Sequence, residues 1–153
     1  MSVKKLIWVL GLSVLLAACS TNNYLAANSP AWRDNSARNM GVRHLLGRGV
    51  EQNDVKAFNY FTKAATQGDV LAQNELAYLY AAGRGTPRNN KLAFEWYKKA
   101  ASSGLSSAQY NLGLMYLRGV GTAADKTLAM EWFKKSAGQG FAPAQAALSQ
   151  NRA

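Results

Sequence analysis

The chain has 153 residues, with 18 lysines and arginines against eight acidic residues, and a formal net charge of +10. Its single histidine and single cysteine, His44 and Cys19, cannot supply the ligand set of a zinc site, so we expect no metal. The lone cysteine also excludes an intrachain disulfide.

The first 18 residues are typical of an export signal. Lys4 and Lys5 precede the apolar stretch LIWVLGLSVLL, residues 6–16. This stretch has the length of a signal-peptide core and is too short to cross a bilayer. We therefore expect an exported protein, and export argues against nucleic acid as a partner.

The sequence LAAC, which ends at Cys19, resembles the lipobox of bacterial lipoproteins. The resemblance implies removal of residues 1–18 and acylation of Cys19, which would anchor the chain in a membrane. Ser20, where an aspartate would favour the inner membrane, implies the periplasmic face of the outer membrane of a Gram-negative cell. Residues 19–30 would then form a polar tether. An ordinary secretory signal with a chance cysteine is the alternative.

A GxG loop recurs three times at a spacing of 36 residues, at residues 47–49, 83–85 and 119–121. Loops that bind nucleotide phosphates occur once, after a strand, and carry a longer motif. No strand pattern is present here. We therefore interpret the loops as boundaries between helices in an internal repeat.

Each repeat is predicted to contain two helices, named helix A and helix B. Helix A of the second repeat is expected from Val70 to Ala82, with one apolar face. Gly83 would end it, because glycine readily takes the left-handed conformation of a helix C-cap. Three residues suited to N-caps precede the predicted B helices: Asn53, Asn89 and Asp125.

The segments AQNELAYLYAAGRGTPRNNKLAFEWYKKAASSG and AQYNLGLMYLRGVGTAADKTLAMEWFKKSAGQG resemble the Sel-1-like repeat, a relative of the tetratricopeptide repeat. The resemblance implies an all-α protein, an α/α solenoid of about three repeats with a C-terminal capping helix. It also implies a non-enzymatic adaptor without cofactor or small-molecule substrate. The solenoid would span residues 31–153, with repeats near 34–69, 70–105 and 106–141 and a partial repeat at 142–150.

His44 stands where the other two repeats have Tyr80 and Tyr116. Because no motif of a catalytic triad accompanies it, we expect a packed variant of the tyrosine position rather than a catalytic base.

The aromatic column Tyr60, Trp96 and Trp132 is expected to lie in the core. The pairs Glu95–Lys99 and Glu131–Lys135 are expected to be helix-surface ion pairs. Since surface pairs account for these carboxylates, we expect no acid–base dyad.

Partner binding is expected on the face of helix A opposite Ala72 and Leu76, where equivalent residues differ between repeats. In related solenoids this face lines the concave groove. Its aromatic, aliphatic, amide and arginine side chains suit a protein interface. Packing of Tyr78 and Leu114 between repeats is the alternative. The predicted contacts are Arg38, Val42, Asn74, Tyr78, Tyr110, Leu114 and Arg118.

Once Lys4 and Lys5 leave with the signal, 16 basic residues face eight acidic ones, a net charge of +8. Anionic headgroups, peptidoglycan carboxylates or an acidic protein could each respond to this charge. A merely solubilising surface is the alternative. The leading hypothesis is an adaptor lipoprotein of the outer membrane. The rivals are an immunity protein against a type VI secretion effector of the phospholipase type, and a charge-driven peptidoglycan tether.

Overall fold

The structure is a computed structural model that describes residues 35–150. This part contains seven helices and no strand, which confirms the expected all-α class. The predicted signal, Cys19 and the tether over residues 19–30 lie outside the described residues. The helices are α3 (Ala37–Leu46), α4 (Asp54–Thr66), α5 (Val70–Ala82), α6 (Asn90–Ser102), α7 (Ser106–Arg118), α8 (Lys126–Gly138) and α9 (Ala142–Gln150).

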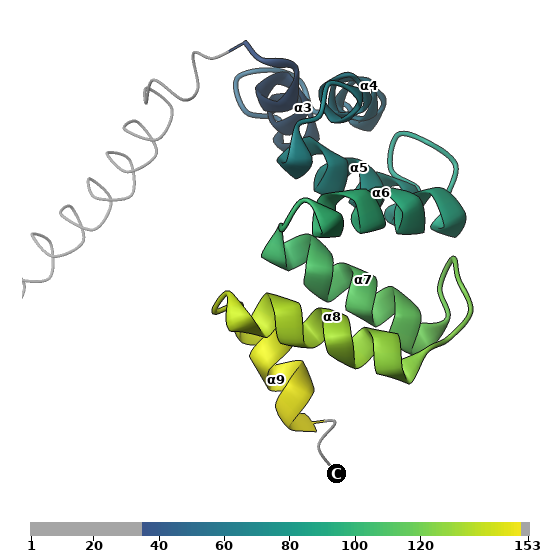
Figure 1. Cartoon of the computed structure of the whole chain (residues 1–153). Helices are drawn as coiled ribbons and strands as arrows, with labels where there is room; N and C mark the ends of the chain where they lie inside the picture. The colour runs from purple at the N-terminus through teal and green to yellow at the C-terminus, as the bar shows by residue number, and fades with distance from the viewer. Residues whose placement is uncertain (1–34, 151–153) are drawn as a thin grey trace, which may run out of the picture. The chain divides into compact units, whose positions relative to one another are not determined.

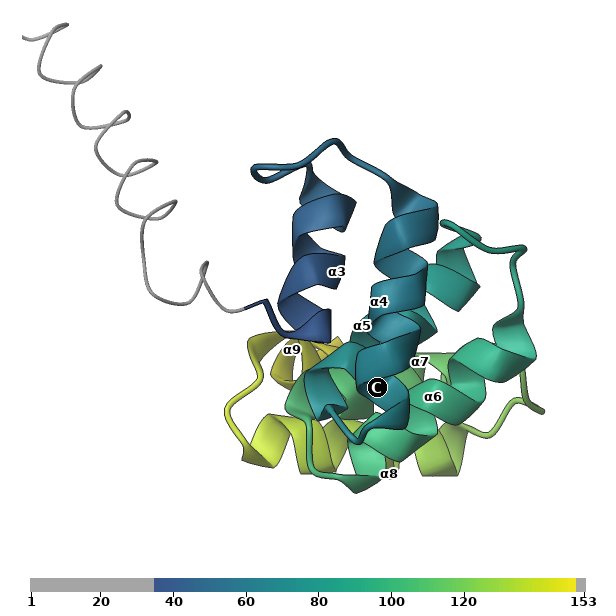
Figure 2. The same cartoon turned by 90° about the horizontal axis from the view of Figure 1, so that it is seen from above.

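A and B helices alternate along the stack (Figures 1 and 2). Helices α3, α5, α7 and α9 are A helices, and α4, α6 and α8 are B helices. Each helix packs mainly against its neighbours in the sequence, so every B helix contacts the A helix of its own unit and that of the next. This succession is the predicted α/α solenoid, with α9 as its last helix.

The helix boundaries follow the residues that the sequence singled out. Asn53, Asn89 and Asp125 each accept a hydrogen bond from the backbone N–H three residues later, at 2.9–3.0 Å. Gly83 has a φ of 68° and ends α5, as predicted, and the equivalent glycines end α3 and α7 in the same way.

The second glycine of the GxG loop has a different role. A Cβ at Gly85 would collide with the carbonyl oxygen of Asp54, and one at Gly121 would collide with that of Asn90. Asp54 and Asn90 are the first residues of α4 and α6. Each loop therefore lies against the start of the preceding unit's B helix, and only glycine leaves room for this contact.

Small buried residues let the helices approach closely. Ala57, Ala93 and Ala129, at one repeated position of the B helices, are fully buried. One alanine in each of α5, α7 and α9, at a repeated position of the A helices, is fully buried as well. Larger side chains fill the rest of the core. The fully buried phenylalanines are Phe61 and Phe133, and the equivalent Tyr97 is 6% exposed.

The expectation that Tyr60, Trp96 and Trp132 lie in the core holds only in part, since Trp96 and Trp132 pack against the edge of the buried cluster. These side chains are only half-buried, and the column one residue later, which contains Phe61, is the buried one. A step of one residue turns a helix by 100°, so the two adjacent aromatic columns cannot point in the same direction. The tryptophans lie on the flank of the B helices.

Candidate functional site

The seven predicted partner residues all lie on A helices, and we call the face that carries them the helix-A surface. Their exposure differs: Tyr78 and Arg118 are exposed, whereas the other five are half-buried. The residues are Arg38 and Val42 on α3, Asn74 and Tyr78 on α5, and Tyr110, Leu114 and Arg118 on α7.

Arg38 is held within the fold. Its Nε donates to Oδ2 of Asp69 at 2.9 Å, and both side chains are about one-third exposed. Asp69 also caps α5, because its Oδ1 accepts from the N–H of Ala72 at 2.9 Å. Arg38 thus ties the first unit to the start of α5, and a partner would meet a guanidinium that is already paired.

Tyr110 packs within the third unit instead of projecting into solvent. Its ring lies 5.6 Å from the rings of both Phe133 and Phe141, measured between centroids. Asn74 is also partly used, since its Nδ2 donates to Oε1 of Glu75 at 3.2 Å. Packing therefore takes up Tyr110, but within its own unit, whereas the alternative considered for Tyr78 and Leu114 was packing between repeats.

The accessible apolar part of the helix-A surface centres on α5. Tyr78 is 43% exposed and Leu71 is 49% exposed, and their separation of seven residues places them on the same face of the helix. Leu46, at the end of α3, is 51% exposed. Leu71 is absent from the predicted contacts. The only indication of Leu71 in the sequence is that the next unit has a serine, Ser107, at the equivalent position.

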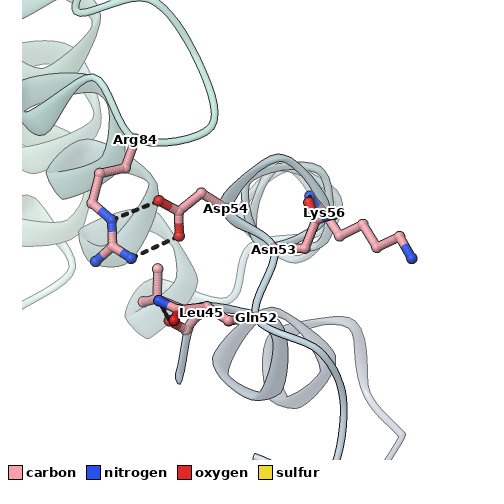
Figure 3. A network of polar contacts seen from close by, with 6 residues as sticks. All are labelled: Leu45, Gln52, Asn53, Asp54, Lys56 and Arg84. Atoms are coloured by element: carbon pink, nitrogen blue, oxygen red, sulfur yellow. Dashed lines mark hydrogen bonds and ion pairs between the residues drawn. The ribbon is translucent and has the colours of Figure 1, made fainter. Parts of the chain in front are cut away.

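Arg84, the middle residue of the second GxG loop, forms a contact that the sequence did not indicate. Its Nε and Nη2 donate to Oδ2 and Oδ1 of Asp54 at 3.0 and 2.6 Å (Figure 3). Hydrogen bonding to Arg84 holds the pKa of the Asp54 carboxyl below its usual value, against a smaller opposing effect of burial. The pair joins the first two units beside the Gly85 contact.

His44 is a packed residue, as predicted. Its ring stacks on Tyr60 with the centroids 5.6 Å apart and the planes 8° apart. Its Nδ1 donates to the Glu51 carbonyl oxygen at 3.2 Å. Both contacts fix the ring within the first unit.

The two predicted glutamate–lysine pairs do not form in the structure. Across residues 35–150 the ion pairs are Arg38–Asp69 and Arg84–Asp54. The ammonium groups of Lys99 and Lys135 lie over the rings of Trp96 and Trp132 instead, 5.1 and 4.1 Å from the centroids. The tryptophan ring offers a flat face and lysine has a long, flexible side chain, so the cation–π contact competes with the solvent-exposed ion pair. Such an exposed pair contributes little to stability.

Two depressions involve the B helices. One, of about 710 Å³, lies on α6 and is lined by Leu92, Trp96 and Lys99 among others. The other, of about 410 Å³, is lined by His44 of α3 and by residues of α4 that include Tyr60 and Lys63.

Within the described residues, no group of three or more His, Cys, Asp or Glu side chains could hold a metal ion. None of the helices in the same range has both the length and the apolar character needed to span a membrane.

Comparison with protein families identifies the Sel1 repeat at residues 35–69, 70–105 and 106–141. A search among curated proteins gives no match. Among solved structures, a Sel1 repeat protein from Oxalobacter formigenes is 39% identical with a TM-score of 0.69, and the match covers 83% of this chain and 97% of that one.

A protective antigen of uropathogenic Escherichia coli that displays an SLR fold is 38% identical with a TM-score of 0.69. That match covers 71% of this chain but 23% of the antigen. Cysteine-rich protein B of Helicobacter pylori, 20% identical with a TM-score of 0.64, covers 75% of this chain and 90% of its own and shares the fold.

Sel1 repeats typically form protein-interaction modules, and proteins built from them are generally non-enzymatic scaffolds. The three matched repeats together span more than half of this sequence. The 36-residue period, the paired helices and the repeated glycine contacts described above are the structural form of these repeats. The chain therefore belongs to the Sel1-repeat family.

Proposed function

We propose that this chain is a non-enzymatic adaptor, anchored by lipid at Cys19 to the periplasmic face of the outer membrane, and that it binds a protein partner on the helix-A surface. The observation that carries the binding proposal is the exposure of Leu71 and Tyr78 on one face of α5. Tyrosine is enriched among the residues that dominate binding energy at protein interfaces, and the exposed leucine adds apolar contact area beside it.

Affinity purification from crosslinked cells tests the binding surface. The variant Leu71→Ser with Tyr78→Ala should lose a protein that the wild-type chain captures. Val55→Ala is the matched control, because Val55 is 57% exposed but lies on α4, a B helix. Retention of every captured protein by the double variant would refute the helix-A surface as the binding site. Tyr110 is unsuitable for this test because its ring packs on Phe133 and Phe141.

The captured protein would also separate the alternatives. A secreted phospholipase effector would make the chain an immunity protein, whereas an envelope protein would make it an adaptor. Recovery of peptidoglycan fragments with the wild type and the double variant alike, with no specific protein, would favour the peptidoglycan tether.

The lipid anchor is tested separately at two adjacent residues. Cys19→Ser should abolish incorporation of labelled palmitate and release the chain from membranes. Ser20→Asp should leave acylation intact but move the protein to the inner-membrane fraction, under the sorting rule for Gram-negative lipoproteins. Membrane fractionation that is unchanged by Cys19→Ser would contradict the anchor.

A further inference from the structure

The two kinds of basic residue occupy different parts of the described chain. All eight lysines of residues 35–150 lie on the B helices: two on α4, three on α6 and three on α8. The six arginines of the same range lie on A helices or in the loops that follow them. Every one of these lysines is exposed. Repetition of a sequence unit thus places lysine on the same side of the stack three times.

Four of the arginines form ion pairs or hydrogen bonds within the fold, whereas the contacts seen for the lysine ammonium groups of residues 35–150 are those of Lys99 and Lys135 with the rings of Trp96 and Trp132. Arg38 and Arg84 form the two ion pairs, and Arg43 and Arg88 donate side-chain hydrogen bonds. In contrast, none of the eight ammonium groups forms an ion pair or a hydrogen bond with another described residue. On α6 and α8 the acidic residues are Glu95 and Glu131, and Asp54 on α4 is already paired with Arg84. The B helices therefore present a strong excess of positive charge.

Amphipathic residues accompany this charge. Trp96 and Trp132 are half-buried on the same helices, and Leu92 is 40% exposed beside Trp96. Tryptophan combines a large apolar ring with a polar N–H group and is enriched at the headgroup level of membranes. Lysine stems can lie along apolar groups while the charges reach phosphates.

We propose that the outward side of α4, α6 and α8, named the lysine face, binds the anionic headgroups of a phospholipid bilayer. Lysine is a flexible point charge, which suits a fluid array of phosphates, whereas geometric recognition of a single carboxylate or phosphate favours arginine. Charge spread over three helices likewise fits an extended surface better than a single anionic group. The helix-A surface would then remain free for a protein partner.

The proposed anchor supports this choice of a membrane over an acidic protein, and to that extent the inference rests on the proposed function. The chain between Cys19 and Asn35 can extend at most roughly 55 Å. This length holds the lysine face within reach of the membrane in which the acyl chains would insert. Each basic residue near an anionic leaflet raises the membrane-binding constant roughly fivefold.

The test measures acetylation of individual lysines by mass spectrometry. The full chain, processed and isolated from envelopes, is bound to vesicles of phosphatidylcholine alone or with added phosphatidylglycerol. We expect B-helix lysines to react at least about fivefold more slowly on the anionic vesicles, and high salt should remove the difference. Equal reaction rates on both vesicles would overturn the proposal.

Two variants at the same four positions provide the matched control. Changing Lys98, Lys99, Lys134 and Lys135 to glutamine should abolish protection of the remaining lysines, whereas changing all four to arginine should preserve it. Protection of the remaining lysines that persists in the glutamine variant would also overturn the proposal. So would protection that appears only after an acidic protein is added. Salt-resistant flotation with neutral vesicles reports the acyl anchor independently, so a failed anchor and a failed lysine face give different results.

Discussion

The junction between the first two units and the junction between the second and third share one backbone contact but differ in their side chains. Gly85 lies against the start of α4 as Gly121 lies against the start of α6. Beside Gly85, Arg84 pairs with Asp54, whereas Val120 and Asn90 stand at the equivalent positions of the second junction. The backbone contact therefore defines the stack, and the ion pair is a local addition.

The turns between units also differ, but here the later unit has the additional side-chain contact. In the third unit, Gln139 Nε2 donates to Gln109 Oε1 at 2.8 Å and to the Gly104 carbonyl oxygen at 3.0 Å. In the second unit Ser103 occupies the equivalent position, and the Oε1 of Gln73 is buried without a partner among the described residues. One end of the stack is thus held by an ion pair and the other by an amide bridge.

The largest expected effect is the loss of the shared backbone contact. Gly85→Ala or Gly121→Ala should lower the free energy of unfolding by about 3 kcal/mol, because the loop must move away from the preceding helix. Gly49→Ala is the control. Its φ of 70° carries the same backbone strain, but the nearest contact is the end of the Arg43 side chain. Equal losses at all three glycines in urea unfolding would refute the importance of the contact.

A second substitution probes packing within a unit. A Cβ at Gly113 would come within 2.6 Å of the Phe133 ring, so Gly113→Ala should destabilise the chain by about 1–3 kcal/mol despite the better helix propensity of alanine. Gly138→Ala, in open space on α8, should be neutral or mildly stabilising. If thermal unfolding shows both variants to be stabilised, the Phe133 ring is not tightly confined.

The amide bridge can be transferred between units. Ser103→Gln should supply Gln73 Oε1 with a donor and raise the free energy of unfolding by about 1 kcal/mol. The reverse change, Gln139→Ser, should cost a similar amount. Loss of stability in Ser103→Gln would show that the second turn cannot accommodate the longer side chain.

The smallest expected effect concerns the Arg84–Asp54 pair. Since both side chains are about one-third exposed, a double-mutant cycle with Asp54→Asn and Arg84→Gln should give a coupling of about 0.5 kcal/mol at neutral pH. Because Arg84 lowers the pKa of Asp54, this contribution is complete above the unfolded-state pKa near 4 and is lost as the pH falls through the lowered value. A coupling that persists in strong acid would exclude an ionic origin.

Most of the fold could be predicted because its signals are local. The bounds of α5 follow from apolar periodicity and Gly83, and the N-caps follow from single residues such as Asn89. Which of two adjacent aromatic columns is buried depends on the rotation of each B helix. That rotation is set by tertiary packing, so the sequence does not reveal that Tyr97 is buried whereas Trp96 packs only at the edge of the core.

The candidate site was less predictable for a related reason. Choosing the A helices required only the repeat, but the accessibility of each side chain depends on residues far away in the sequence. Arg38 is paired by Asp69, 31 positions later, and Tyr110 is covered by Phe133 and Phe141. Tyr78 stays 43% exposed although its side chain interacts with Arg84, and nothing local to its sequence indicates this difference.

The repeated contact between loop and helix makes the length of this protein adjustable. A second copy of residues 70–105 inserted after residue 105 would place its own Gly85 equivalent against Asn90, and its own Asn90 equivalent would receive Gly121. No existing contact would need a new kind of partner. Elongation by whole units would therefore extend both outer surfaces in proportion, so that reach and valence grow while the backbone contact at each junction stays the same.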